Sequence, residues 1–414
     1  MDDISQVPGI LEYRHMSASF NYDVIIAGGG PAGSSAAIHL STRGARVLLA
    51  EQKKFPRAKL CGEFISPECA LHFERLGVVD QILAAGPARL SETVFYSRRG
   101  RSVSVPSAWF GPSGIALGLS RAEMDERLLR RAGEAGAHVL EGAQVTNLLF
   151  DDRAVSGVVL KHGGRESRYR ASVTLDATGR TRALARQAER NGTKLHRAPL
   201  VAFKAHLADT RVAAGACEIY FYRGGYGGLS SIENGLSNLC FIASAKDVRA
   251  CGANAERVMR EVVCQNQRAA ETLRNAKART QWLAVTLEKF GRHKLSPAKG
   301  LLTIGDAASF IDPFTGSGML MALESGELAA GVISDHLRES PSKDVDELSA
   351  SYQAAYEQRF DSRLRVCSLM RRAAFTPGIA AIAIRMFGLS DHVRHFIARG
   401  TRRPSRTNVS SLDL

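Results

Sequence analysis

The alternation of apolar and polar positions predicts a strand, a helix and a second strand near the start of the chain. An apolar run at 22–27 ends in three consecutive glycines, and small residues followed by larger apolar ones continue up to Gly44. A second apolar run, at 45–50, stops at Glu51. Runs of this length, separated by a segment of helical period, are typical of a βαβ unit. The pattern therefore predicts an α/β fold.

Farther along the chain the pattern changes. Two short apolar runs around a basic turn predict a hairpin at 91–105, and Ser120 with Glu123 three residues later predicts the start of a helix. Residues 199–287 favour strands, interrupted by a charged segment at 255–278 that we interpret as helical. The last quarter of the chain is expected to be helical. This mixture predicts a second domain built around a sheet.

Composition and charge narrow the class of protein. The chain has 414 residues, 45% of them hydrophobic and 23% charged, which argues against a largely disordered, fibrous or polytopic membrane protein. The first residues show no basic start followed by an apolar run, so no secretory signal is expected. Seven scattered cysteines without a CxxC pair predict free thiols in the cytoplasm and no metal site. The net charge of +14 favours anionic partners without naming one.

A glycine pattern follows the first predicted strand. Gly28, Gly30 and Gly33 fit the spacing GxGxxG, with the predicted helix after them and Glu51 at the end of the next strand. The first glycine allows a tight turn, the second lets a pyrophosphate approach the backbone, and the third lets helix and strand pack closely. The helix N-terminus offers N–H groups to phosphates, and Glu51 is placed to accept ribose hydroxyls. The motif predicts a bound dinucleotide, NAD or FAD, against the alternative of a glycine-rich turn in an unrelated fold.

Two further blocks decide between these cofactors. Gly305-Asp306 ends a predicted buried strand, and a glycine-rich stretch at 312–318 precedes an apolar helix. With the first motif and the segment 176–180, these blocks make the chain similar to the flavoprotein monooxygenase superfamily that includes para-hydroxybenzoate hydroxylase. The branch that it resembles most holds geranylgeranyl reductases and flavin-dependent halogenases. The resemblance covers about residues 21–335 and implies FAD as the cofactor.

The resemblance also implies a division of the chain. The cofactor would lie in a discontinuous, Rossmann-like FAD-binding domain of the glutathione-reductase type, and an inserted β-sheet domain would hold the substrate. We expect an extension at 1–20, the FAD-binding domain at 21–90, 116–198 and 296–335, the substrate domain at 91–115 and 199–295, and a helical C-terminal region with a basic tail at 336–414.

Single residues acquire expected roles from the resemblance. Asp306 would bind the ribityl chain of FAD, and the segment from Pro313 to Gly318 would aim a helix at the flavin. Arg121 would reach toward FAD from the start of its helix. An ordinary helix cap is the alternative for Asp306, and a solvated basic side chain is the alternative for Arg121.

The segment around residues 55–67 would cross the flavin face, as in the reductase branch. The residues expected at the cofactor are therefore Gly28, Gly30, Pro31, Ala32, Gly33, Glu51, Gln52, Arg57, Lys59, Cys61, Gly62, Arg121, Gly179, Gly305, Asp306, Pro313, Gly316, Ser317 and Gly318.

Two residues are candidates for a part in the chemistry. Tyr226 fits a tyrosine of the geranylgeranyl reductases, although the tryptophan and proline that accompany it there are absent. Cys61 has Lys59 close by, a charge that would lower a thiol pKa, and a purely structural role is the alternative. The tryptophan-containing signature of the halogenases is missing, and no second GxGxxG is present. NAD(P)H would therefore bind transiently, as the reductant of FAD.

The resulting hypothesis is an FAD-dependent oxidoreductase. In the favoured version NAD(P)H reduces FAD, O2 adds to the flavin at C4a, and the hydroperoxide hydroxylates an apolar or aromatic small molecule of the secondary-metabolite type. One alternative is the saturation of lipid or isoprenoid double bonds, as in geranylgeranyl reductases. A second, from another class, is a non-catalytic lipid or prenyl carrier on the same fold.

Arginines gather near the C-terminus. Ten of them lie between residues 361 and 406, against two acidic residues, and the apolar stretch among them is too short to span a bilayer. A basic amphipathic helix here would make weak contact with an anionic membrane surface. The alternative is a helix that covers the substrate domain and keeps a solvated basic face. No nucleic-acid partner is expected, since no recognition module is present.

Overall fold

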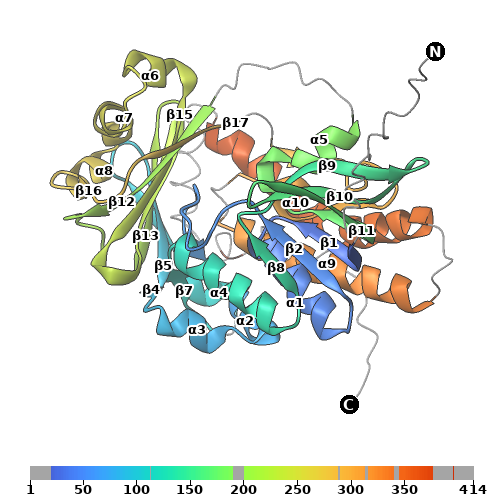
Figure 1. Cartoon of the computed structure of the whole chain (residues 1–414). Coiled ribbons are helices and arrows are strands. Elements are labelled where there is room, and N and C mark those ends of the chain that lie inside the picture. The colour runs from blue at the N-terminus through green and yellow to red at the C-terminus, as the bar shows by residue number, and fades with distance from the viewer. Residues whose placement is uncertain are drawn as a thin grey trace, which may run out of the picture.

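The computed structural model places two sheets side by side, with helices packed against each (Figure 1). It describes residues 20–111, 113–189, 200–287, 290–312, 316–339, 345–375 and 395. Within these ranges no helix is long and apolar enough to cross a membrane. Pro313, nearly all of the expected N-terminal extension and most of the basic tail lie outside the described residues.

The first sheet has seven strands and a parallel centre. Its strands run in the order β8-β2-β1-β11-β10-β9. The short strand β19 lies off this path and pairs in parallel with the end of β11. Ala27 pairs with Ala50 on one side and with Asp176 on the other, and Asp176 pairs with Thr303. The carboxyl ends of four parallel strands therefore meet at one edge of the sheet. The strands are β1 (Phe20–Ala27), β2 (Val47–Glu51), β8 (His138–Glu141), β9 (Gln144–Asp151), β10 (Ala154–His162), β11 (Arg165–Asp176) and β19 (Leu301–Thr303).

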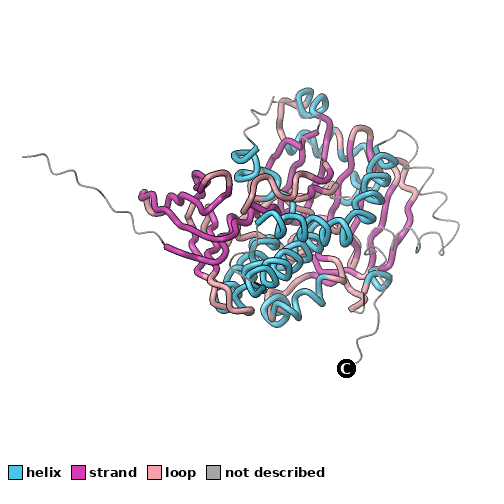
Figure 2. The backbone as a smooth tube through the Cα atoms, turned by 90° about the vertical axis from the view of Figure 1, so that its right-hand side faces the viewer, coloured by secondary structure: helices cyan, strands magenta, loops and turns pink. Residues whose placement is uncertain are grey.

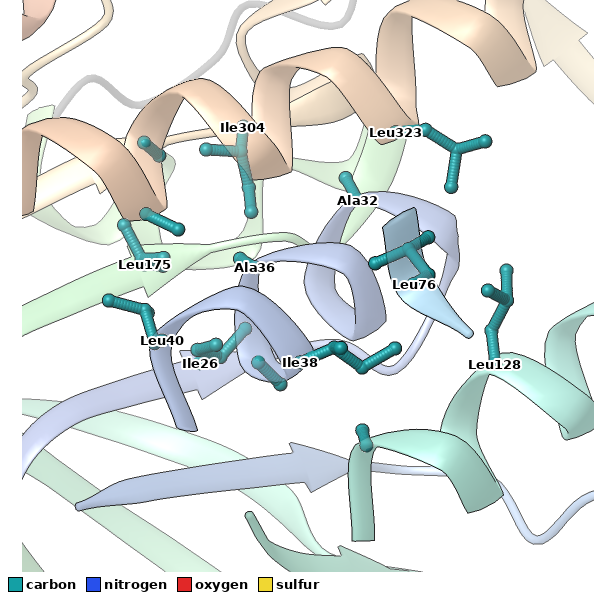
Figure 3. Packing of buried hydrophobic residues seen from close by; sticks show 14 of the residues in the cluster. Ile26, Ala32, Ala36, Ile38, Leu40, Leu76, Leu128, Leu175, Ile304 and Leu323 are labelled. Carbon is teal, nitrogen blue, oxygen red and sulfur yellow. The ribbon is translucent and has the colours of Figure 1, made fainter. Parts of the chain in front are cut away.

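Two helices stack on this sheet at close range. α1 (Pro31–Thr42) packs against α9 (Gly318–Glu339), and the side chains labelled in Figure 3 are all buried between them and their neighbours. A Cβ on Gly326 of α9 would lie 2.4 Å from the carbonyl oxygen of Ala32, so glycine permits this approach. The same core continues to α2 (Cys69–Leu76), α3 (Val79–Ala84), α4 (Arg121–Glu134) and α10 (Val345–Phe375).

The second sheet has eight strands, and Figure 1 shows it at the left. Its order is β16-β12-β15-β14-β13-β5-β6, with β17 paired to β12, and the predicted hairpin is β5–β6. α6 (Ala245–Ala250) and the two helices that follow it cover its outer face. The strands are β5 (Glu92–Tyr96), β6 (Ser102–Pro106), β12 (Leu200–Ala208), β13 (Ala216–Tyr222), β14 (Gly225–Ser231), β15 (Ser237–Ser244), β16 (Lys277–Ala278) and β17 (Leu283–Leu287).

The segment at 255–278, expected to be helical, is helical up to residue 272, but in separate pieces, and the prediction is wrong for its end. The segment contains α7 (Ala255–Glu261), α8 (Gln267–Thr272) and then strand β16. The break lies at Asn266, whose Oδ1 accepts from Ala269 N at 3.2 Å and starts a new helix. Its Nδ2 also donates to Phe221 O at 3.0 Å, which ties the break to the sheet. A long-range contact thus overrides the local helical pattern.

Smaller elements join the two sheets. Figure 2 shows the helices grouped across the middle of the molecule, with strands on both sides.

Arg363 of α10 is fully buried and donates to Glu324 of α9 at 2.5 Å, so α10 is part of the core. Three short strands, β3 (Phe64–Ile65), β4 (Ala88–Leu90) and β7 (Ala116–Gly118), form a third sheet. β18 (Gly291–Arg292) pairs with β20 (Ser309–Phe310), and α5 (Ala183–Glu189) follows β11.

Candidate cofactor site

A cavity of about 570 Å³ lies at the edge where the parallel strands end. This is the usual ligand position in α/β folds, because loops from neighbouring strands diverge there. The cavity continues from that edge to the inner face of the second sheet, at Ala202, Cys240 and Ile242. Of the residues expected at a cofactor, it is lined by Gly28, Gly30, Pro31, Ala32, Glu51, Gln52, Arg57, Lys59, Cys61, Gly62, Arg121, Gly179, Gly305, Asp306, Gly316 and Gly318.

The turn between β1 and α1 depends on two of its glycines. Gly28 has φ = 111°, and a Cβ there would lie 2.4 Å from Ala177 O. A Cβ on Gly33 would lie 1.9 Å from Gly28 O, so helix and turn could not pack with any larger residue. Gly33 therefore does not line the cavity, and its role is to let α1 pack against the turn. The turn leaves the N-terminus of α1 facing the cavity at Gly30 and Pro31.

Glu51 stands at the end of β2, on the cavity wall. Its Oε2 accepts from Gly29 N at 2.9 Å and its Oε1 from Lys53 N at 2.9 Å. These two bonds fix the carboxylate beside the glycine turn and couple β2 to it. Each oxygen keeps a further lone pair for a ligand hydroxyl.

Two arginines share one buried carboxylate next to the N-terminus of α1. Arg121 forms two hydrogen bonds of 2.7 Å to Asp125, and Arg57 lies 3.3 Å from the same carboxylate. Burial alone would lower the pKa of Arg121, but Asp125 raises it overall, so the guanidinium stays charged. Ser120 caps α4, the helix that Arg121 begins, by accepting from Glu123 N at 3.3 Å, as the sequence predicts. The guanidinium groups of Arg57 and Arg121 are therefore fixed at the end of the cavity next to the N-terminus of α1.

The opposite wall comes from the ends of β11 and β19. Asp176 is fully buried and accepts from Thr178 N at 3.0 Å, which shapes the turn toward Gly179. Asp306 follows β19 and lies among the charges of Arg180, Arg121 and Lys59. Burial raises the pKa of Asp306, and these three cations oppose the rise.

A charged cluster joins this wall to the second sheet. Glu63 is fully buried, and its Oε1 accepts from Lys204 Nζ at 2.5 Å and from Arg121 N at 2.8 Å. Its Oε2 lies 2.7 Å from His206 Nε2. Lys204 and His206 are both on β12 and point to the same face, since they are two residues apart.

The far end of the cavity is apolar. Phe310 stacks on Phe290 with 4.8 Å between ring centroids, and the guanidinium of Arg180 lies 5.4 Å from the Phe310 centroid. Burial, with the neighbouring Cys61, raises the pKa of Cys240 to about 12, so this thiol is neutral near pH 7. The apolar wall here is made by Leu60, Ala202, Ile242, Leu287, Phe310 and Ile311.

Tyr226 is buried outside the cavity wall. It lies on β14, within the apolar cluster of the inner sheet face, and its hydroxyl donates to Asp312 Oδ1. The hydroxyl is therefore engaged with the residue that precedes the glycine-rich loop. Cys61, in contrast, lines the cavity, and its carbonyl oxygen accepts from Asn238 Nδ2 at 3.1 Å.

Comparison with known proteins identifies the family of this chain. Residues 21–358 match a family of proteins described as FAD binding domain. The chain belongs to this FAD-binding family. The resemblance expected from the sequence is thereby confirmed, with the α/β fold class, FAD as cofactor and NAD(P)H as its typical reductant. The family and its relatives also support an enzyme, an FAD-dependent oxidoreductase.

Similar proteins cover nearly the whole chain. A menaquinone reductase of Mycolicibacterium smegmatis is 27% identical over 88% of this chain and 88% of its own length. The solved flavin-dependent brominase Bmp2 has a TM-score of 0.77 at 21% identity, covering 92% of this chain and 93% of its own. PqsL of Pseudomonas aeruginosa in complex with 2-aminobenzoylacetate has a TM-score of 0.67 at 19% identity, covering 92% and 98%. These structural similarities support the fold.

The residues of the cavity fit FAD. A Cβ added at Gly30 would meet only guanidinium nitrogens of Arg57 and Arg121, both at 3.8 Å, so a pyrophosphate could reach the backbone there. A Cβ at Gly62 would meet no atom within 4 Å, which leaves an open wall for a flat ring. An FAD-binding protein needs both features, a polar cradle for phosphates and an open face for the flavin.

The individual roles of the predicted residues stay predictions. Ser317 is fully buried directly before α9, and Pro313 lies outside the described residues. Sequence reasoning missed Glu63, Lys204 and His206 as a cluster. A signal was present, because two polar residues alternate with apolar ones in the strand Val201–Leu207. Alternation alone gave no reason to pair Lys204 and His206 with a glutamate 141 and 143 residues away.

Proposed function

We propose that this chain is an NAD(P)H-dependent flavin monooxygenase that hydroxylates an apolar or aromatic small molecule. The observation that carries the proposal is the apolar end of the cavity, formed by the inner face of the second sheet with Leu60 and Phe310. Bound FAD would supply two-electron chemistry and, once reduced, the activation of O2. The chain would hold the substrate against the apolar wall and exclude water from it.

The acid that reduction would need is not readily supplied by Cys240, Tyr226 or Lys204, and this favours oxygen transfer over reduction. Saturating a double bond takes a hydride and a proton, so the wall would have to supply an acid. Cys240 is a poor acid because its pKa is about 12, and the hydroxyl of Tyr226 already donates to Asp312. Lys204 is held by the Glu63 carboxylate. Hydroxylation of an electron-rich ring instead removes a proton from the reacting carbon, so it needs no acid at that position.

A reductase of isoprenoid double bonds is the second candidate. The menaquinone reductase of Mycolicibacterium smegmatis, similar over most of both chains, is the observation in its favour. In that reaction the Cys61 thiol, on the cavity wall, would be the candidate proton donor. A Cys61→Ser variant separates the two: it should reduce double-bond saturation strongly and leave hydroxylation nearly unchanged.

Isotope labelling tests the proposal directly. Purified protein, NAD(P)H and candidate aromatic polyketides or prenylated quinones are incubated under 18O2 and, in parallel, under argon. Substrate-stimulated NAD(P)H oxidation with one 18O atom in the product supports the monooxygenase. A product that gains two hydrogens under argon contradicts it and establishes the reductase. A colourless protein that binds lipid without FAD would instead indicate the carrier.

We also propose weak contact with anionic membranes through the tail beyond residue 375. Each arginine near such a surface contributes about 1 kcal/mol and is screened by salt. Deleting residues 376–414 keeps the buried Arg363 in place. Co-sedimentation with anionic vesicles should fall with rising salt and with this deletion. Unchanged binding of a folded deletion variant would show that residues 376–414 do not contact the membrane.

A further inference from the structure

Glu63 has a backbone conformation that few residues other than glycine adopt. It follows Gly62 on the cavity wall and has φ = 53°, with its side chain fully buried. Both features cost free energy: the left-handed conformation is strained, and a buried carboxylate must be compensated by partners. Strain of this kind persists where the surrounding structure enforces it, and such positions concentrate at functional sites.

The partners of Glu63 come from both sides of the cavity. The backbone N–H of Arg121 belongs to α4, on the cofactor side, the helix whose Asp125 carboxylate lies 3.3 Å from Arg57. Lys204 and His206 belong to β12, on the substrate side. One carboxylate therefore links the start of α4 to the second sheet.

The rest of the segment is tied to the same sheet. Cys61 O accepts from Asn238 Nδ2, and Asn238 on β15 pairs directly with His206 on β12. Cys240, the next residue of β15 on this face, pairs with Lys204 and lines the cavity. Two adjacent strands thus hold Cys61 and Glu63, the residues on either side of Gly62, at the place where the wall is open for a ring.

The charges of the cluster support this linkage. Burial would raise the pKa of Glu63, but the hydrogen bond with His206 and the charge of Lys204 lower it overall. The carboxylate is therefore ionised, and its bond to the ammonium of Lys204 is charge-assisted. Charge-assisted bonds are shorter and stronger than neutral ones and define a geometry closely.

We propose that Glu63 is a positioning residue, which through Lys204 and His206 fixes the placement of the substrate sheet relative to the Cys61–Gly62 wall that faces the flavin. The placement sets the distance between a substrate on the inner sheet face and the reactive edge of the cofactor. A shift of about 1 Å in such a distance can change a rate roughly a hundredfold. The catalytic consequence rests on the proposed function, whereas the contacts do not.

The test replaces the charge and keeps the shape. Glu63→Gln is compared with Glu218→Gln, a matched control on β13 of the same sheet. Glu218 is equally buried, accepts from Arg268 at 2.7 Å, and faces the outer helices. Three readouts are made on the FAD-loaded proteins: the thermal midpoint, hydrogen exchange of the peptide spanning 59–65, and the visible spectrum of the flavin. Product formed per NAD(P)H oxidised is the fourth.

The expected pattern separates positioning from stability. Both variants should lose thermal stability, but only Glu63→Gln should speed exchange at 59–65, by roughly tenfold, and shift the flavin bands. It should also lower product per NAD(P)H severalfold while NAD(P)H oxidation continues. Unchanged exchange and spectrum in Glu63→Gln, or equal changes in both variants, would overturn the inference.

A milder variant covers the case in which Glu63→Gln does not fold. His206→Asn removes the partly exposed partner and leaves the Lys204 bond, so the same readouts should move in the same direction by a smaller factor. No movement in that variant counts against the inference. If no O2 is consumed by any protein, the proposed function fails, and the exchange and spectral readouts still decide the role of Glu63.

Discussion

Arg371 Nε lies 3.2 Å from Asp312 Oδ2, so helix α10 contacts the end of the segment that follows β19. The guanidinium of Arg371 also lies 4.1 Å from the ring centroid of Phe290. Asp312 is buried and receives the hydroxyl of Tyr226 on its other oxygen. The second sheet, the end of the segment 305–312 and helix α10 therefore meet at one carboxylate. At least two of the arginines near the C-terminus, Arg363 and Arg371, have a packing role.

This arrangement predicts the effect of Tyr226→Phe. Removing the hydroxyl takes one hydrogen bond from a buried carboxylate, so the free energy of unfolding should fall by about 1–3 kcal/mol while FAD stays bound. Tyr222→Phe is the control, because that hydroxyl donates to a backbone oxygen of the same sheet, Ile242 O, at 3.0 Å. Denaturant unfolding and kcat are measured for both. A fall in kcat of several hundredfold at unchanged stability would instead give Tyr226 a part in the chemistry.

Asp306→Ala should weaken FAD retention. If Asp306 accepts a ribityl hydroxyl, its loss removes a charge-assisted hydrogen bond worth about 1.5–3 kcal/mol, or roughly 10- to 150-fold in Kd. Fluorescence titration of the apoprotein with FAD measures the change. Asp335→Ala, at an exposed position on α9, is the control and should bind FAD normally. Acid precipitation of the parent protein should release all the flavin; flavin left in the pellet would indicate covalent attachment.

Three glycine substitutions should behave differently for steric reasons. Gly33→Ala places a Cβ 1.9 Å from Gly28 O and should abolish FAD binding or folding. Gly62→Ala meets no protein atom within 4 Å, so the fold should persist while FAD affinity falls, because the methyl group would stand on the open wall.

Gly331→Ala, in α9, is the control for these substitutions. It also meets nothing within 4 Å and should raise stability by about 0.5–1 kcal/mol, since alanine is the better helix former. Circular dichroism melts and FAD titrations distinguish the three variants. Normal FAD affinity in Gly62→Ala would show that the flavin does not lie against this wall.

Acid stability should depend on Glu327. Its hydrogen bond with His72, aided by Arg75, lowers the pKa of Glu327 to about 2, below the usual 4.5. A carboxyl with a lowered folded pKa stabilises fully above its unfolded pKa and loses that contribution as pH falls through the folded value. The loss should therefore occur between about pH 4.5 and 2.

Glu327→Gln should lower stability at pH 7 by about 1–2 kcal/mol and flatten the decline below pH 4.5. Denaturant midpoints from pH 7 to pH 2.5 measure it. Glu256→Gln, in an exposed helical ion pair with Arg260, is the control and should leave the curve nearly unchanged. Parallel curves for the parent and Glu327→Gln would contradict the assignment.

The sequence by itself determined the features that depend on neighbouring residues. Gly28 and Gly33 are required by the backbone of a single turn, and Ser120 caps its own helix, so both features could be predicted from neighbouring residues. The blocks at 176–180 and 305–306 follow strands whose ends align, which the parallel register places at one edge. Local sterics and hydrophobic period carry this information because they act within a few residues.

Only the tertiary structure decided which distant side chains meet. Glu63 and Lys204 are 141 residues apart, and no period in either segment names the other. Tyr226 could be found by resemblance, yet its hydroxyl turned out to be held by Asp312 rather than exposed to the cavity. The segment 255–278 was broken by the contacts of Asn266 with strands far away in the chain. A buried polar group is stabilised by whichever partners the packed sheets bring within about 3 Å, and that choice is made only when both sheets are in place.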